Sequence, residues 1–157
     1  MKGNEKLLLV LNSLLADELT VINQYIVQSE MCANWGYSKL HKVIKKQAID
    51  EMHNAEWLIE RILFFEGSPT VSKLNLMKIG KTVSEMISSD NETELKVVNE
   101  YNDAIKLAHQ VGDQGTVDLL TKILKEEEGH VDWAEIQRAQ IEQMGLENYL
   151  VNQIDSQ

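Results

Sequence analysis

Hydrophobic residues recur at intervals of three or four positions along most of the chain, which is the period of an amphipathic α-helix. The first stretch shows this pattern at Leu7, Leu11, Leu14, Leu15, Ile22 and Ile26. The alternation of hydrophobic and polar residues that marks a half-buried strand is absent from the sequence. Because the chain has a single proline and eight glycines, few positions interrupt a helix. The pattern therefore predicts an all-α protein.

Capping and turn residues divide this pattern into separate helices. We expect four long helices and a short C-terminal one, over about residues 5–34, 39–66, 83–111, 114–144 and 146–154. The side chains that can cap the long helices are Asn4, Ser38, Thr82, and either Asp113 or Thr116. Gly36 and Gly112 follow two of the expected helix ends, where glycine is favoured. The whole chain, residues 1–157, is predicted to form one domain.

The lengths of the connections predict the topology. Residues 35–38 and 112–115 are short links, so the first two helices should be antiparallel, and so should the last two. The connection over residues 67–81 is much longer. At roughly 3.3 Å per extended residue it reaches about 50 Å, enough to traverse a helix of about 27 residues rising 1.5 Å each. We therefore expect a four-helix bundle in which a long crossover joins helices two and three.

Charge and cysteine content narrow the class of function. The chain carries 15 basic and 25 acidic residues, for a formal charge of −10. This surplus of acids disfavours a nucleic-acid partner, whose phosphates would be repelled, and favours cations. The single cysteine, Cys32, permits no intramolecular disulfide, which fits a reducing compartment. No apolar run approaches the roughly 18 residues of a membrane span. We expect a cytoplasmic protein without a membrane partner.

Four glutamates and one histidine stand within the apolar stripes of the predicted helices. Glu18 and Glu51 are 33 residues apart, and Glu94 and Glu127 have the same separation. A second offset, of 76 residues, relates the first pair to the second, and His130 follows Glu127 by one helical turn. Any one of these acids alone could be an ordinary edge or helix-end residue. Their shared register instead matches the ligand scheme of di-metal carboxylate bundles.

Burying four carboxylates together is expensive unless cations or protons neutralise them. Two divalent cations would balance the four negative charges. A ligand set of carboxylate oxygens with imidazole suits iron or manganese, whereas zinc generally takes fewer oxygens. The sequence therefore predicts a di-metal site formed by Glu18, Glu51, Glu94, Glu127 and His130.

Segments spread over the whole chain resemble the bacterioferritin family. They are Met1-Lys2-Gly3, Glu18-Leu19 with Ile22-Asn23-Gln24-Tyr25, Asn34-Trp35-Gly36, Asp50-Glu51-Met52, Glu60-Arg61-Ile62-Leu63, Glu127-Glu128-Gly129-His130 with Asp132-Trp133, and Met144-Gly145-Leu146 with Asn148-Tyr149-Leu150. The resemblance implies a ferritin-like bundle assembled into a 24-subunit cage. Such a cage oxidises Fe(II) with O₂ or H₂O₂ at two irons per subunit and stores ferric mineral. By the same resemblance Glu51 and Glu127 bridge the irons, Glu18 completes the first iron site, and Glu94 and His130 complete the second.

The chain departs from the family pattern at position 54. The family has Glu-x-x-His on the second helix, whereas this sequence has Glu51-Met52-His53-Asn54. His53 lies about 200° around a regular helix from Glu51, so only a π-bulge would bring it to the site. Asn54 offers a carbonyl oxygen, a weaker donor than imidazole to a transition metal. Our hypothesis is that two metals still bind, with the Glu18-side metal held more weakly and iron oxidation slowed.

Two further residues acquire roles from the resemblance. An isolated methionine is usually a packing residue, but Met52 matches the axial ligand of a haem b that two subunits share. Tyr25, on the same helix stripe as Glu18, would otherwise be a core residue, and beside two irons it could supply an electron to peroxide. Haem at a dimer interface also implies an electron donor for iron release, such as a ferredoxin.

Two alternatives from other classes stay open. One is a small di-metal oxidoreductase that reduces peroxide and works as a dimer. The other is a structural cage or haem carrier whose bundle site is inactive. The mass of the assembly and its iron loading under air separate these alternatives from the iron-storage cage.

Overall fold

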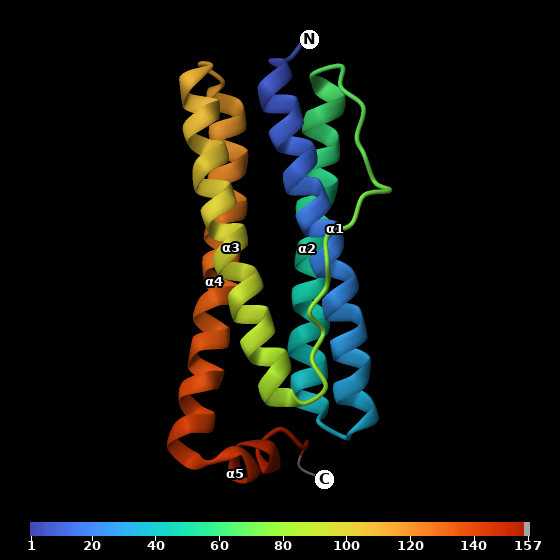
Figure 1. Cartoon of the computed structure of the whole chain (residues 1–157), viewed down its shortest axis with the longest axis vertical. Coiled ribbons are helices and arrows are strands. Elements are labelled where there is room, and N and C mark those ends of the chain that lie inside the picture. The colour runs from blue at the N-terminus through green and yellow to red at the C-terminus, as the bar shows by residue number, and fades with distance from the viewer. Residues whose placement is uncertain (156–157) are drawn as a thin grey trace.

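Four long helices run side by side in this computed structural model, which describes residues 1–155, and a short fifth helix crosses one end (Figure 1). Their bounds are α1 Glu5–Asn34, α2 Ser38–Phe64, α3 Val83–Gln110, α4 Gln114–Met144 and α5 Leu146–Val151. The described residues contain no strand. The predicted all-α bundle with a short C-terminal helix is confirmed.

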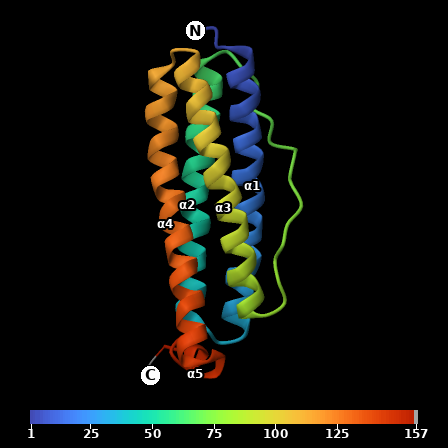
Figure 2. The same ribbon diagram turned by 60° about the vertical axis from the view of Figure 1, so that its left-hand side comes forward.

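The topology also follows the prediction. Short turns join α1 to α2 and α3 to α4, and the connection between α2 and α3 runs back along the outside of the bundle beside α1 (Figures 1 and 2). Polar side chains of α1 hold this crossover along its length. The bonds include Asn12 Oδ1 accepting from Thr70 N at 2.8 Å, Thr20 Oγ1 accepting from Asn75 N at 2.8 Å, and Gln28 Nε2 donating to Ile79 O at 2.9 Å.

Three of the four predicted N-caps hold their helices, and the fourth is wrong. Asn4, Thr82 and Asp113 accept from backbone N–H groups at 3.1, 3.2 and 3.0 Å. Ser38 is instead the first residue of α2, and Tyr37 precedes it without a side-chain cap. The reason is tertiary, because the C-terminal tail covers this helix end. Lys39 N donates to Gln153 O at 3.0 Å.

The same contacts correct two predicted helix ends. The fifth helix ends at Val151, three residues earlier than expected, where the tail turns back toward α2. There Asp155 N donates to Ser38 Oγ at 3.3 Å, and its carboxylate pairs with Lys42 Nζ at 2.9 Å. The second helix ends at Phe64 rather than near residue 66, because Glu66 has left-handed backbone with φ of 60°.

The interior contains two hydrophobic clusters with a polar layer between them. One cluster, toward the α3–α4 turn, includes Leu11, Leu15, Leu58, Leu120 and Ile123. The other, toward α5, includes Cys32, Leu40, Ile44, Met86 and Tyr149. The four glutamates at positions 18, 51, 94 and 127 lie at the level between these clusters and are each about 1% exposed. The packed clusters therefore hold a buried acidic layer in mid-bundle.

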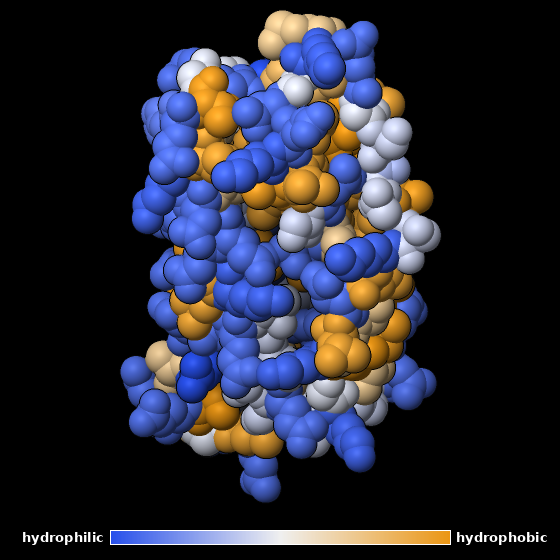
Figure 3. Space-filling view, turned by 45° about the horizontal axis from the view of Figure 1, so that its top comes forward, coloured by the Kyte–Doolittle hydropathy of each residue, from blue (hydrophilic) through white to orange (hydrophobic). Residues whose placement is uncertain are grey.

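One helix corrects the expectation about membrane spans. By length and composition α1 is apolar enough to cross a membrane. However, 61% of its most apolar window is buried inside the bundle. A core helix of a water-soluble bundle passes the same test, so this is weak evidence for insertion. Hydrophilic side chains cover much of the face seen in Figure 3, with hydrophobic ones in patches between them.

Candidate metal centre

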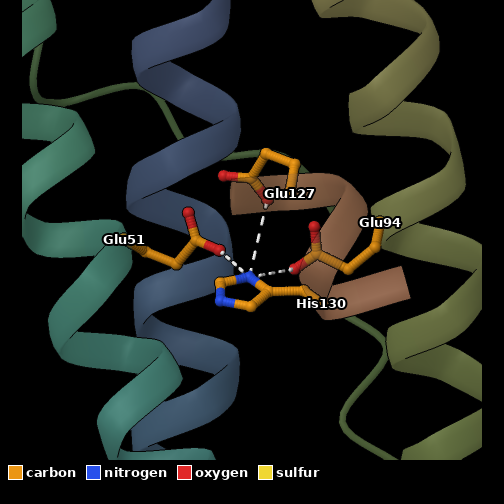
Figure 4. A group of neighbouring side chains, drawn as sticks. All are labelled: Glu51, Glu94, Glu127 and His130. Carbon is orange, nitrogen blue, oxygen red and sulfur yellow. Dashed lines mark ion pairs between the residues drawn. The ribbon is translucent and has the colours of Figure 1, made fainter. Parts of the chain in front are cut away.

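Four predicted ligands converge on one point in the polar layer. Figure 4 shows Glu51 from α2, Glu94 from α3, and Glu127 and His130 from α4 pointing toward one another. One ligand atom from each lies within 4.8 Å of all the others. The Nδ1 atom of His130 is 2.8 Å from Glu51 Oε1, 3.6 Å from Glu94 Oε1 and 3.7 Å from Glu127 Oε2. The helical register inferred from the spacing therefore brings these side chains together.

Glu18, from α1, completes the set on the opposite side. Its carboxyl group lies within hydrogen-bonding reach of those of Glu51 and Glu127, although it is outside the tightest group of four. Its Oε1 atom accepts a hydrogen bond from Tyr101 Oη at 2.6 Å. Glu51 and Glu127 thus stand between a Glu94–His130 side and a Glu18 side, the arrangement expected of two bridging carboxylates.

Two tyrosines mirror each other across this centre. Tyr25 Oη donates to Glu94 Oε1, just as Tyr101 Oη donates to Glu18 Oε1. Tyr25 was expected beside the site, but Tyr101 was taken only as part of an apolar stripe. The signal was nevertheless present, because the offset of 76 residues that relates Glu18 to Glu94 also relates Tyr25 to Tyr101. The duplication covers the residues around the ligands as well as the ligands themselves.

Asn54 lies where a second histidine would complete the symmetry. Its Nδ2 atom donates to Glu127 Oε1 at 3.0 Å and to Glu51 Oε2 at 3.2 Å. Its Oδ1 atom is buried and has no hydrogen-bond partner in the described part of the chain. In this conformation the amide nitrogen, rather than the carbonyl oxygen, faces the bridging carboxylates. A half-turn of the amide about its last side-chain bond would present the oxygen to a cation.

His53 and Met52 lie away from the centre. The second helix is regular throughout, without the π-bulge that His53 would need to reach the carboxylates. Instead His53 is exposed and its ring stacks on that of Trp57, with ring centroids 6.5 Å apart. Met52 is 44% exposed. Its thioether is therefore available at the surface of α2 and takes no part in the acidic layer.

The electrostatics of the cluster favour a bound cation. Burial, with repulsion between neighbouring carboxylates, raises the pKa of Glu51 and Glu127, and burial also raises the pKa of Glu18. Burial opposes the lowering of the Glu94 pKa, but hydrogen bonds with Glu127, His130 and Tyr25 outweigh it. Burial likewise opposes the rise of the His130 pKa to about 11, which Glu127 and Glu94 cause. Without metal, the cluster must hold protons.

Several ligand atoms also lack hydrogen bonds. Buried atoms without a partner among residues 1–155 include Glu18 Oε2, Glu51 Oε1, Glu94 Oε2 and His130 Nδ1. The close approach of His130 Nδ1 to Glu51 Oε1 is an ion-pair distance without hydrogen-bond geometry. Orphaned polar atoms are rare in a folded interior because each one costs about 1–3 kcal/mol. Their concentration at one point fits a set of metal ligands.

A second group of possible ligands adjoins His130. One ligand atom each of Asp50, Glu126 and His130 lies within 4.8 Å of the others, and His130 Nε2 is 3.6 Å from Asp50 Oδ2. Glu126 also accepts from Asn54 Nδ2 at 3.4 Å. The spacing of ligands in the sequence did not predict Asp50 or Glu126, since both are only partly buried and stand outside the repeated offsets.

Comparison with known proteins assigns this geometry to a family. The model of the ferritin-like domain matches residues 8–144. A bacterial ferritin of Synechocystis sp. is 41% identical over 155 residues, which are 98% of this chain and 99% of the relative. The chain belongs to the bacterioferritin family. The bacterioferritins of Brucella melitensis and Mycolicibacterium paratuberculosis are 35% and 36% identical, over 95% of this chain and 92% and 94% of theirs. The resemblance inferred from the motifs is confirmed, and this bacterioferritin family member is an iron-storage protein of ferritin-like fold.

Proposed function

We propose that this bacterioferritin family member oxidises Fe(II) with O₂ or H₂O₂ at the Glu18, Glu51, Glu94, Glu127 and His130 cluster. It then stores the product as ferric mineral inside a 24-subunit cage in the cytoplasm. The observation that carries this proposal is the convergence of buried carboxylate and imidazole atoms that have no hydrogen-bond donor of their own. Iron is the substrate, and two irons would balance the four carboxylate charges.

The two iron positions are unequal in this proposal. The first has Glu94 and His130 as its own ligands, with Glu51 and Glu127 as bridges. The second has Glu18 with the same bridges, and Asn54 in place of imidazole. Because histidine and asparagine are both neutral, the exchange leaves the charge balance unchanged. An amide oxygen is a weaker donor than an imidazole nitrogen, so the Glu18-side iron binds more weakly and oxidation is slower.

The tyrosines have distinct roles beside the two positions. Tyr25 contacts Glu94, on the side with the complete ligand set, and is the residue that supplies an electron when peroxide is reduced. Its hydroxyl proton already points at Glu94 Oε1, which can accept it as the electron leaves. Tyr101 orients Glu18 and keeps one of its oxygens engaged, so that only Glu18 Oε2 is free for iron.

The exposed side of α1 and α2 suits a haem shared between two copies of the chain. Met52 is accompanied there by exposed hydrophobic residues, namely Ile26, Val27 and Ile49. A thioether from each of two subunits would hold haem b, and such ligation raises the haem potential. Haem supplies electron transfer there, and a ferredoxin is the class of donor expected to reduce the mineral for release.

A second candidate function has one observation in its favour. The amide of Asn54 is hydrogen-bonded to both bridging carboxylates, which is how an inert site without metal would be stabilised. On this alternative the protein is a structural cage or haem carrier. A small peroxide-reducing dimer is the remaining alternative, and the size of the assembly separates it from both cages.

The test compares the purified chain with Asn54→His under air. Size-exclusion with light scattering first gives the mass of the assembly, and stopped-flow absorbance then gives the initial rate of Fe(II) oxidation. We expect a 24-mer that oxidises iron, and a rate several-fold higher for Asn54→His. Asn99→His, at an exposed position of α3, is the matched control and should behave as wild type. Oxidation no faster than in buffer would reject the ferroxidase proposal. Equal rates for wild type and Asn54→His would reject the unequal-site argument.

A further inference from the structure

A second pair of acidic side chains faces across the interface between α1 and α3, beside the metal centre. Glu18 on α1 meets Tyr101 on α3, and their immediate neighbours, Asp17 and Glu100, meet in the same way. The inner contact is a carboxylate with a phenol. The outer contact is a carboxyl group against a carboxyl group, with no hydrogen-bond donor between them.

The outer pair is buried and has free oxygens. Asp17 is 6% exposed, and both Asp17 Oδ2 and Glu100 Oε2 are buried without a hydrogen-bond partner in residues 1–155. The other oxygen of each is engaged, since Asp17 Oδ1 accepts from Asn75 Nδ2 at 2.6 Å and Glu100 Oε1 is 3.6 Å from Lys96 Nζ. These bonds fix both carboxyl groups. Two acceptor oxygens held face to face require either a shared proton or a cation between them.

A cavity of about 410 Å³ adjoins this pair between α1, the crossover and α3. Asp17, Thr20 and Asn75 line it on one side, and Lys96 on the other. A cation with six waters occupies roughly 200 Å³, at about 30 Å³ per water, so the cavity can admit a hydrated ion. The Lys96 side chain is 66% exposed, so it can move aside when a cation approaches Glu100.

The charges around the pair also favour a cation. Asp17 and Glu100 carry two negative charges when ionised, and Lys96 offsets one of them. On the rim of the cavity, Lys78 and Glu92 neutralise each other at 3.2 Å. The free Glu18 Oε2 lies next along the same interface, so unpartnered carboxylate oxygens continue from Asp17 to the metal centre. Such a sequence of oxygens draws divalent cations inward.

We propose that Asp17 and Glu100 bind a divalent cation between Asp17 Oδ2 and Glu100 Oε2, with water from the adjoining cavity completing its coordination. The site takes a hard or borderline cation such as Fe(II) or Mn²⁺, since its ligands are oxygens. A second step, which rests on the proposed function, passes Fe(II) from this pair to Glu18, the ligand of the weaker iron position.

Crystals of the full chain soaked in Mn²⁺ test the site directly by anomalous scattering. Wild type should show a peak between Asp17 and Glu100 in addition to the peaks of the central cluster. The double variant Asp17→Asn/Glu100→Gln, which preserves shape, should lose that peak alone. Asp103→Asn/Asp118→Asn removes two exposed carboxylates and should keep it. If the double variant fails to fold, Glu100→Gln alone serves, because Glu100 is only partly buried.

Stopped-flow kinetics test the transfer step. Because a cleft of one charge speeds cation entry by about 10–10³-fold, Fe(II) oxidation should start about tenfold more slowly in Asp17→Asn/Glu100→Gln and normally in Asp103→Asn/Asp118→Asn. Mn²⁺ at the central cluster with none at the pair overturns this inference and leaves the proposed function standing. Mn²⁺ at the pair with an empty central cluster does the reverse. An unchanged oxidation rate in a variant that has lost the outer peak rejects the transfer.

Discussion

Asp90 provides a quantitative test of how this bundle tolerates buried charge. It lies on α3, is 2% exposed, and accepts hydrogen bonds at 2.8 Å from both Gln24 Nε2 and Gln28 Nε2. Its Oδ2 atom has no partner in the described residues. Burial raises the pKa of Asp90 from 3.8 to about 7, because the two amide bonds only partly replace the lost hydration.

The sign and size of the effect on stability follow from this shift. A folded-state pKa above the unfolded one means that the folded chain binds the proton more tightly. Stability from this residue is therefore complete below pH 3.8 and is lost as the pH rises through about 7. Three units at 1.36 kcal/mol per unit correspond to about 4 kcal/mol. Asparagine stays neutral and can keep the acceptor oxygen, so Asp90→Asn should escape this loss.

Urea unfolding of wild type and Asp90→Asn, in the presence of a chelator, measures the difference. Relative to wild type, the variant should gain about 1–2 kcal/mol at pH 5 and about 4 kcal/mol at pH 8. Asp103→Asn, at an exposed position of the same helix, is the control for loss of a carboxylate and should show no such slope. A difference between Asp90→Asn and wild type that stays constant from pH 5 to 8, or falls with pH, would refute the argument.

Three further substitutions have defined outcomes. Arg61→Ala should lower the free energy of unfolding by about 2–3 kcal/mol in urea titrations, because it removes two charge-assisted bonds of 2.9 Å to α4; a loss below 0.5 kcal/mol would contradict this. Tyr101→Phe leaves Glu18 without its donor, so calorimetry should find the metal-free protein less stable and the Mn²⁺-loaded protein less affected; equal losses in both states would oppose a ligand role for Glu18. Met52→Ala should abolish haem absorbance while the assembly keeps its mass, and a retained six-coordinate haem spectrum would exclude Met52 as the ligand.

The parts of the structure that sequence predicts best are those that repeat. Helix lengths follow from hydrophobic periodicity, and the long crossover follows from the length of one connection. The ligands could be placed because Glu18, Glu51, Glu94 and Glu127 share offsets of 33 and 76 residues, which fix a common level in the bundle. Burial of all four at about 1% exposure agrees with that register.

The parts that the sequence does not predict depend on contacts between distant segments. Ser38 has the chemistry of an N-cap, but a tail more than 100 residues away covers that helix end. The orientation of the Asn54 amide depends on carboxylates from another helix, 73 positions along the chain in the case of Glu127. Asp17 and Glu100 would pass for two ordinary surface acids in the sequence. Only the packing of α1 against α3 brings them together.

Metal occupancy at the two central positions tests the main claim most directly. Crystals of wild type and Asn54→His, soaked in the same Mn²⁺ solution, give both occupancies from anomalous differences. The account predicts a well-occupied position beside Glu94 and His130 in both proteins, and a Glu18-side position that is partly occupied in wild type and filled in Asn54→His. Equal occupancy of the Glu18-side position in both proteins, or an empty Glu94 side, would contradict it.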